Sequence, residues 1–160
     1  MQWTFKEIDK TIKTDSFDCG VPALNEYLQK YARQNHDKGL GKTHVAVKDG
    51  NRAVGYYTIS SAQVNSPDLP EETRMRLPKY PVPAIRIGRL AIDKMMKGKG
   101  LGRELLMHSL TTILDISKKV GVFLVLVDAK DESAIAFYKK YGFVPFPETP
   151  NTLFLQVSSL

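Results

Sequence analysis

Three glycines at alternate positions precede a long helical pattern in the segment MMKGKGLGRELL, residues 95–106. Side chains at Gly98, Gly100 and Gly102 would obstruct a ligand that approaches the backbone, and glycine removes that obstruction. A strand, such a turn and then a helix make backbone N–H groups converge at a helix N-terminus, whose partial positive charge attracts phosphate. The segment therefore predicts an anion site, with a simple flexible turn as the alternative.

Two common nucleotide-binding motifs do not fit the glycines of this chain. The dinucleotide fingerprint has the spacing G-x-G-x-x-G, whereas residues 98–102 have G-x-G-x-G. The segment HDKGLGKTH offers Gly41, Lys42 and Thr43 in the order of a Walker loop, but His36 stands where the first glycine belongs. That segment also leads from a helix into a strand, the reverse of the order that a P-loop needs. We therefore reject both motifs.

The elements around the glycines form a βαβ unit. Strand patterns cover residues 84–93 and 122–128, and the helical pattern of residues 100–119 lies between them. The two strands should therefore run parallel. A second helix is predicted over residues 132–141, followed by short strands near 143–146 and 152–157.

The first half of the chain predicts one strand, one helix and a hairpin. Residues 3–8 alternate like a half-buried strand, and Pro22 begins an amphipathic helix. The turn Asp49-Gly50-Asn51 joins the two strands of a hairpin that ends near Val64. The following segment, residues 66–83, contains five prolines and should be irregular, with one helical turn near Glu71 to Leu77.

Length and composition indicate one globular domain over residues 1–160. The chain is 42% hydrophobic and 25% charged, and it shows no repeat or linker. Cys19 is the single cysteine, so it cannot form an internal disulfide, and the charged start lacks the apolar run of a signal peptide. With no apolar run of membrane-spanning length, we expect a cytoplasmic protein without a membrane partner.

The net charge and the spacing of the histidines indicate which classes of ligand the chain could bind. The net charge is +6 and the isoelectric point about 9.4, which permits binding to a nucleotide or a nucleic acid. His36, His44 and His108 do not have the spacing of metal ligands. We therefore predict that each is hydrogen-bonded within the protein or exposed to solvent, and that the protein binds no metal.

Two motifs in the right order resemble the GNAT family of acetyl-CoA-dependent N-acetyltransferases. The first is KGKGLG at residues 97–102, and the second is A-x-x-x-Y-x-x-x-GF at Ala134, Tyr138, Gly142 and Phe143. The resemblance implies an α/β (α+β) fold with a central mixed, mostly antiparallel sheet, a splayed parallel strand pair and helices on both faces. It also implies acetyl-CoA as the acetyl donor.

The resemblance further implies which residues bind acetyl-CoA. The pantetheine arm would pair with the backbone of Leu90, Ala91 and Ile92. Asp131 would lie beside the cofactor, where the family often has Asn, and it can still cap the helix. The pyrophosphate would bind the glycine loop and its cations, with Lys in place of the usual Gln or Arg at the first position: Lys97, Gly98, Lys99, Gly100, Leu101, Gly102 and Arg103.

Tyr138 is the predicted catalytic residue. Direct attack of a neutral amine on the thioester releases CoA as a thiolate, which a nearby hydroxyl can protonate. A phenol with a reference pKa of about 10 can give its proton to a thiolate whose thiol titrates near about 8.5. The alternative is that Tyr138 is one more aromatic residue on the apolar face of its helix.

A narrower resemblance concerns the acceptor. Five stretches resemble the GNAT toxins of bacterial type II toxin–antitoxin modules: F-D-C-G-x-x-x-L-N-x-Y-L (Phe17 to Leu28), VGYYTIS, GRLAID, DAKDESAIAFYKKYGF and LFL. Those toxins acetylate the α-amine of the amino acid on charged tRNA and stop translation. The resemblance implies aminoacyl-tRNA as acceptor and a ribbon-helix-helix antitoxin as partner. A homodimer is one alternative for the oligomeric state, which the sequence leaves open.

Basic residues are the predicted acceptor contacts. Arg33, Arg86 and Arg89 are the candidates for substrate binding, although residues 86 and 89 should point to opposite faces of a strand unless Gly88 forms a bulge. Other cations lie near the first helix and in the proline-rich segment: Lys30, Lys38, Lys42, Arg74, Arg76 and Lys79.

No base is required for such an acceptor. The pKa of an α-amine beside an ester is at or below about 7.7, so much of it is neutral at cellular pH.

Two alternative functions stay open. One is a GNAT enzyme that acetylates a small-molecule amine or a protein amino terminus, and the other is a non-catalytic acyl-CoA-binding relative.

Overall fold

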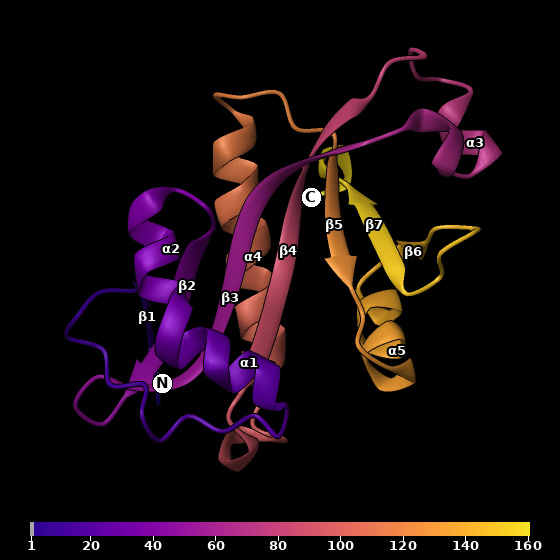
Figure 1. Ribbon diagram of the computed structural model, residues 1–160. Helices are drawn as coiled ribbons and strands as arrows, with labels where there is room; N and C mark the ends of the chain where they lie inside the picture. Colours follow the sequence, from indigo (N-terminus) through magenta and orange to yellow (C-terminus); the bar gives the residue numbers. More distant parts are fainter. Residues whose placement is uncertain (1) are drawn as a thin grey trace. The chain divides into compact units, whose positions relative to one another are not determined.

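The computed structural model describes residues 2–160, and Figure 1 labels its helices and strands. Seven strands form one mixed sheet in the order β1-β2-β3-β4-β5-β7-β6. The chain divides into two compact units, a first unit of residues 2–60 with Arg89–Ser109 and a second unit of Ser61–Gly88 with Leu110–Leu160. No helix within residues 2–160 is long and apolar enough to cross a membrane.

The strands of the first unit are antiparallel. β1 (Thr4–Glu7) pairs with β2 (Lys42–Lys48), which pairs with β3 (Arg52–Val64). The turn between β2 and β3 has positive φ at Asp49 (46°), Gly50 (76°) and Asn51 (67°). Asp, Gly and Asn tolerate this backbone conformation, so the predicted hairpin is confirmed.

A continuous run of helical residues covers one face of these strands. It consists of α1 (Pro22–Glu26), a π-helical segment η1 (Tyr27–Tyr31) and α2 (Ala32–Lys38), where the sequence predicted one regular helix. Apolar residues of this run and of the strands share one buried core: Ile8, Ile12, Phe17, Tyr27, Leu28, Ala32, Val45, Val47, Ala53, Tyr56 and Ala91.

The opposite face of β3 receives α4 (Leu101–Ser117). Gly55 in β3 makes this close approach possible, because a Cβ there would meet the Leu105 side chain at 2.9 Å and the Leu101 side chain at 3.2 Å. Leu101, Leu105 and Leu106 are fully buried. The first unit therefore has a helix on each face of its strands.

The second unit contains the parallel pair. β4 (Val82–Ile92) and β5 (Leu124–Asp128) pair from Ala84–Leu124 to Ile87–Val127, as the βαβ pattern predicted. β5 also pairs with β7 (Thr152–Gln156), and β7 with β6 (Val144–Pro145), both antiparallel. The core beneath is formed by Val64, Leu69, Val82, Ala84, Leu124, Leu126, Phe146 and Phe154.

The proline-rich segment belongs to the second unit. It contains η2 (Ser66–Asp68) and the four-residue helix α3 (Glu71–Arg74), close to the single helical turn that the sequence predicted. Leu69 lies in the core and Leu77 packs against it, so apolar side chains anchor the segment at two points.

The contacts of Gly55 generate a stability prediction. Gly55→Ala should lower the free energy of unfolding by about 1–3 kcal/mol, because the new methyl group overpacks the contact with α4. Gly88→Ala in β4 is the matched control, since a Cβ there has nothing within 4 Å and φ is not positive. It should be neutral or stabilise by up to about 1 kcal/mol. Urea unfolding measures both, and equal effects of the two substitutions would contradict this account.

Candidate active site

The glycine loop connects β4 to α4 through η3 (Lys94–Met96). Gly98 and Gly100 have φ of 80° and 85°, a left-handed conformation that costs other residues about 1–2 kcal/mol. A Cβ on either glycine would find nothing within 4 Å. These two glycines therefore serve the backbone turn and leave the space above it open.

The start of α4 supplies donors for an anion. Its first backbone bond runs from the Glu104 N–H to the Gly100 carbonyl (3.2 Å), so the N–H groups of Leu101, Gly102 and Arg103 precede the helical ladder. Lys97, Lys99 and Arg103 are exposed. The Leu101 side chain is fully buried, so this residue can reach a ligand only through its backbone.

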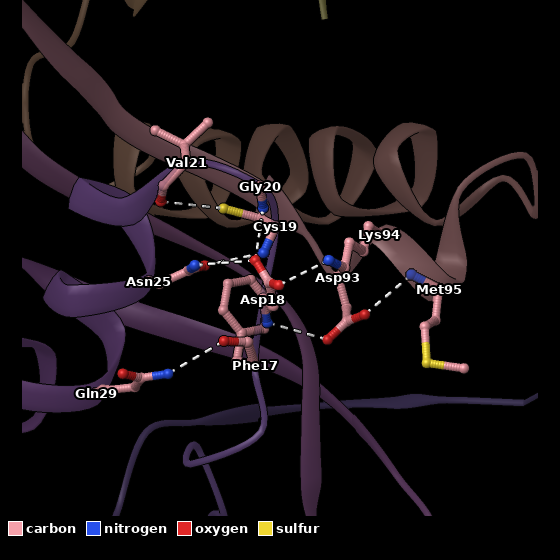
Figure 2. Close-up of polar contacts among 10 residues, drawn as sticks. All are labelled: Phe17, Asp18, Cys19, Gly20, Val21, Asn25, Gln29, Asp93, Lys94 and Met95. Atoms are coloured by element: carbon pink, nitrogen blue, oxygen red, sulfur yellow. Dashed lines mark hydrogen bonds and ion pairs between the residues drawn. The ribbon is translucent and has the colours of Figure 1, made fainter.

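Two aspartates hold the backbone just before the loop (Figure 2). Asp93 is 4% exposed, and its two oxygens accept the N–H groups of Met95 (2.9 Å) and Asp18 (3.2 Å). The ammonium group of Lys94 pairs with the Asp18 carboxylate at 2.9 Å, and the Lys94 N–H donates to the Asp18 carbonyl at 2.9 Å. Burying a carboxylate is costly unless it is hydrogen-bonded, and here both oxygens have partners.

Asp18 is itself fixed by the segment around it. Its other oxygen accepts the Gly20 N–H (2.9 Å) and the Asn25 amide (3.1 Å), while the Asn25 oxygen accepts the Cys19 N–H (2.8 Å). Hydrogen bonds from Lys94, Gly20 and Asn25 lower the pKa of Asp18 to about 2. The F-D-C-G-x-x-x-L-N pattern thus acquires a structural role that the sequence reading missed, although an Asp two residues before Gly is a known turn signal.

The backbone predicted to pair with pantetheine lies at the end of β4. Leu90 and Ile92 are half-buried and Ala91 is buried. All three follow the Ala84–Ile87 stretch that pairs with β5. Their contact with a cofactor stays a prediction.

Tyr138 lies on α5 (Glu132–Lys140) in the second unit. Its ring is 6% exposed and packs edge-on against Phe137 and Phe143, with centroids 5.3 and 5.5 Å apart. Burial and the charge of Asp128 raise the pKa of Tyr138 to about 12.

Asp131 caps the same helix. Its carboxylate accepts the Ala134 N–H at 2.8 Å, as expected of an N-cap. A hydrogen bond to the cofactor from this residue stays a prediction.

The three candidate arginines have three different environments. Arg33 is exposed on α2 and lines a cavity of about 380 Å³. Arg86 pairs with Asp128 at 2.5 Å, and Asp128 also accepts the Thr152 hydroxyl at 3.2 Å. The Arg89 guanidinium lies over the Tyr27 ring, 3.6 Å from its centroid. Acceptor binding by these arginines stays a prediction.

The histidines have intramolecular partners. His36 is buried, and its Nδ1 accepts the Thr43 N–H at 2.9 Å. His108 shares a 2.7 Å hydrogen bond with the Tyr57 hydroxyl. Burial and the neighbouring His108 lower the pKa of His44 to about 4. Within residues 2–160, no group of three or more His, Cys, Asp or Glu side chains could hold a metal ion.

Comparison with known sequences identifies relatives over most of the chain. A model of the acetyltransferase (GNAT) family matches residues 6–143. The chain is 37% identical over 140 residues to the tRNA-acetylating toxin of Mycobacterium tuberculosis, and the match covers 88% of this chain and 83% of that protein.

Solved structures of toxins share the fold. A tyrosine-to-phenylalanine mutant of KacT has a TM-score of 0.94 and 32% identity, covering 99% of this chain and 97% of that one. AtaT complexed with acetyl-methionyl-tRNAfMet has a TM-score of 0.92 and 29% identity, covering 99% and 96%. An AtaT mutant bound to the C-terminus of the antitoxin AtaR and to acetyl-CoA has a TM-score of 0.84 and 26% identity, again covering 99% and 96%.

These matches confirm the resemblance and the α/β fold with a mixed, mostly antiparallel sheet and one parallel pair. The chain belongs to the acetyltransferase (GNAT) family and is an N-acetyltransferase that uses acetyl-CoA.

Proposed function

We propose that this N-acetyltransferase is a toxin that acetylates the α-amine of the amino acid on aminoacyl-tRNA and so blocks translation. The observation that carries the proposal is the 37% identity to a tRNA-acetylating toxin over 88% of the chain. The fold likeness to AtaT with acetyl-methionyl-tRNAfMet supports the same acceptor. Aminoacyl-tRNA as acceptor would place the reaction in the cytoplasm.

The loop of residues 97–103 binds the pyrophosphate of acetyl-CoA in this proposal. The open space above Gly98 and Gly100 and the N–H groups that precede the Glu104–Gly100 bond at the start of α4 suit an anion. Lys97, Lys99 and Arg103 add positive charge. Leu90, Ala91 and Ile92 offer backbone groups to the pantetheine arm, and Asp131 contributes through the α5 N-terminus that it caps.

The reaction needs no dedicated base. A neutral α-amine attacks the thioester carbonyl, the new C–N bond forms, and the nitrogen loses its proton to water. The C–S bond then breaks, and the Tyr138 O–H donates toward the departing sulfur.

The pKa of Tyr138 decides how it helps. At about 12, this pKa keeps the phenol protonated at cellular pH. Complete transfer of the proton to a thiolate whose thiol titrates near about 8.5 would be uphill by roughly 5 kcal/mol. Tyr138 therefore helps most by donating a hydrogen bond to the developing thiolate, before the C–S bond has fully broken.

Arg33 and Arg89 are the stronger candidates for tRNA contact. Arg86 is neutralised by Asp128, so it adds little net attraction for phosphate. Arg89 keeps its charge while Tyr27 holds its guanidinium, and Arg33 is exposed beside Lys30 at the 380 Å³ cavity.

The partner in this proposal is an antitoxin of the ribbon-helix-helix class. The complex of an AtaT mutant with its antitoxin AtaR supports an antitoxin as partner.

The first test concerns the loop. Gly100→Val should abolish measurable acetyl-CoA binding in calorimetry, because a β-branched residue cannot hold φ of 85° and its side chain would fill the open space. Gly39→Val is the matched control, with φ of 76° at the end of α2 and nothing within 4 Å of a Cβ. It should cost similar stability and spare binding. Unchanged affinity in Gly100→Val would remove the loop from the cofactor site.

The second test concerns Tyr138. Tyr138→Phe should lower kcat by about 10²-fold, the range of a lost general acid, and leave acetyl-CoA affinity unchanged. Tyr141→Phe is the matched control, since that ring also packs against Phe137, at 5.2 Å. Steady-state kinetics that gave wild-type turnover in Tyr138→Phe would return Tyr138 to a packing role.

The pH profile provides the control on protonation. Tyr138 must be protonated to donate, and a pKa of about 12 means that activity should not fall as pH rises to about 10. Deprotonation of the acceptor amine should give a rising limb at or below about pH 7.7. A falling limb below about pH 10 that Tyr138→Phe removes would contradict the assignment.

The third test identifies the acceptor. Labelled acetyl-CoA is incubated with the protein and a mixture of charged tRNAs, polyamines and peptides, and the label should reach the tRNA fraction. Expression of the protein alone should arrest growth. If label reaches only amines or peptides and growth continues, the toxin proposal fails while the acetyltransferase assignment stands.

The salt dependence of tRNA binding tests whether one particular arginine contacts a phosphate. Arg33→Ala should weaken tRNA binding and reduce the slope of log affinity against log salt by about 0.7–0.9, since one phosphate contact is lost. Lys118→Ala is the control, because that lysine pairs with Asp115 on α4.

A further inference from the structure

We infer that Asp18 and Asp93 are positioning residues for acetyl-CoA, so that the segment Phe17–Gly20 acts in cofactor binding from outside the glycine loop. The inference rests on the proposed function in one respect, the assignment of the pyrophosphate to residues 97–103. All the contacts that carry it lie within the first unit of the fold.

Asp93 fixes the point at which β4 ends. Its backbone N–H donates to the Val54 carbonyl in β3 at 2.8 Å, while its carboxylate accepts the N–H groups of Asp18 and Met95. The backbone that leaves β4 is therefore held from three directions, by β3, by the N-terminal segment and by η3.

Lys94 joins the same backbone to Asp18 at two points. Its N–H donates to the Asp18 carbonyl and its ammonium group pairs with the Asp18 carboxylate, both at 2.9 Å. Met96 is buried, and its carbonyl accepts the Lys99 N–H at 3.3 Å. The chain from Lys94 to Lys99 thus enters the loop already positioned.

The N-terminal segment is rigid enough to serve as the anchor. Phe17 is 2% exposed and packs edge-on against Tyr56 at 5.6 Å. The Gln29 amide donates to the Phe17 carbonyl at 3.1 Å, and Asn25 bonds both Asp18 and Cys19. Figure 2 shows Gln29 and Asn25 reaching this segment from the helical side and Asp93 and Lys94 meeting it on the other.

A purely electrostatic effect of the two carboxylates and a positioning role predict opposite changes in acetyl-CoA affinity. Two carboxylates beside a pyrophosphate site repel the ligand, so on electrostatics alone their removal should tighten acetyl-CoA binding. Their role in holding the loop predicts the opposite, because displaced N–H groups no longer point at the phosphate oxygens. The sign of the change in affinity therefore separates the two effects.

The experiment measures acetyl-CoA binding to Asp93→Asn and Asp18→Asn in the full chain. Each substitution keeps the size of the side chain but removes its charge and one acceptor oxygen, which at Asp93 accepts a backbone N–H and at Asp18 accepts an N–H or pairs with Lys94. The dissociation constant from calorimetry should rise about 10- to 100-fold, while kcat at saturating acetyl-CoA changes by less than about threefold. Hydrogen exchange should accelerate at the amides of residues 95–103 and at the Asp18 and Gly20 amides that these carboxylates accept, and not elsewhere in the first unit.

Asp115→Asn is the matched control. It breaks the exposed ion pair between Asp115, near the end of α4, and Lys118, just beyond it (3.6 Å), and should leave the dissociation constant unchanged. A double-mutant cycle with Asp18→Asn and Lys94→Met should be non-additive, since each single change already breaks the same ion pair. If Asp93→Asn does not fold, acetyl-CoA binding to Asp18→Asn and this double-mutant cycle test the inference.

Unchanged or tighter acetyl-CoA binding in folded Asp18→Asn and Asp93→Asn would overturn the inference. If Gly100→Val still abolished binding, the loop assignment would survive that result. If Gly100→Val also bound normally, the proposed cofactor loop itself would be wrong. The two failures are therefore distinguishable.

Discussion

The buried carboxylate of Asp93 is the constraint on which the candidate cofactor site depends. A carboxylate that is 4% exposed is stable only with its oxygens satisfied, and here the donors are the N–H groups of Asp18 and Met95. The cost of breaking either bond ties two stretches of chain, far apart in sequence, to one geometry. The positive φ at Gly98 and Gly100 then turns the backbone from that fixed point into the first turn of α4.

Much of the fold could be predicted from the sequence because its signals are local. The Asp49-Gly50-Asn51 turn, the βαβ order and the alternation in the strands each depend on neighbouring residues, and each appears where expected. The π-helical segment at Tyr27–Tyr31 was not predicted, because the apolar spacing that indicates a helix does not distinguish the backbone bond from Ala32 N–H to the Tyr27 carbonyl from that of a regular helix. The observed ends of β4 and α4 differ from the predicted ones by one or two residues.

The glycine turn and the helix cap at Asp131 can be recognised in the sequence, but the contacts between distant residues cannot. Asp18 and Asp93 are 75 positions apart, and nothing in either local sequence predicts their hydrogen bond. Likewise, the Arg89 guanidinium meets the Tyr27 ring through the fold and not through a motif. The F-D-C-G pattern belongs to the resemblance, but the sequence does not explain why these residues occur together. The structure explains it by the contacts of Asp18 with Gly20, Asn25 and Lys94.

Asp128 takes part in an ion pair of the second unit and also affects the pKa of Tyr138. Its carboxylate pairs with Arg86 of β4 and accepts the Thr152 hydroxyl of β7, so one side chain joins three neighbouring strands. The same charge contributes to the raised pKa of Tyr138. Arg86 is therefore paired, whereas the Arg89 guanidinium lies over the Tyr27 ring and Arg33 is exposed, both in the first unit. The strand that carries Arg86 and Arg89 thus provides a counterion within the second unit and a guanidinium over an aromatic ring within the first.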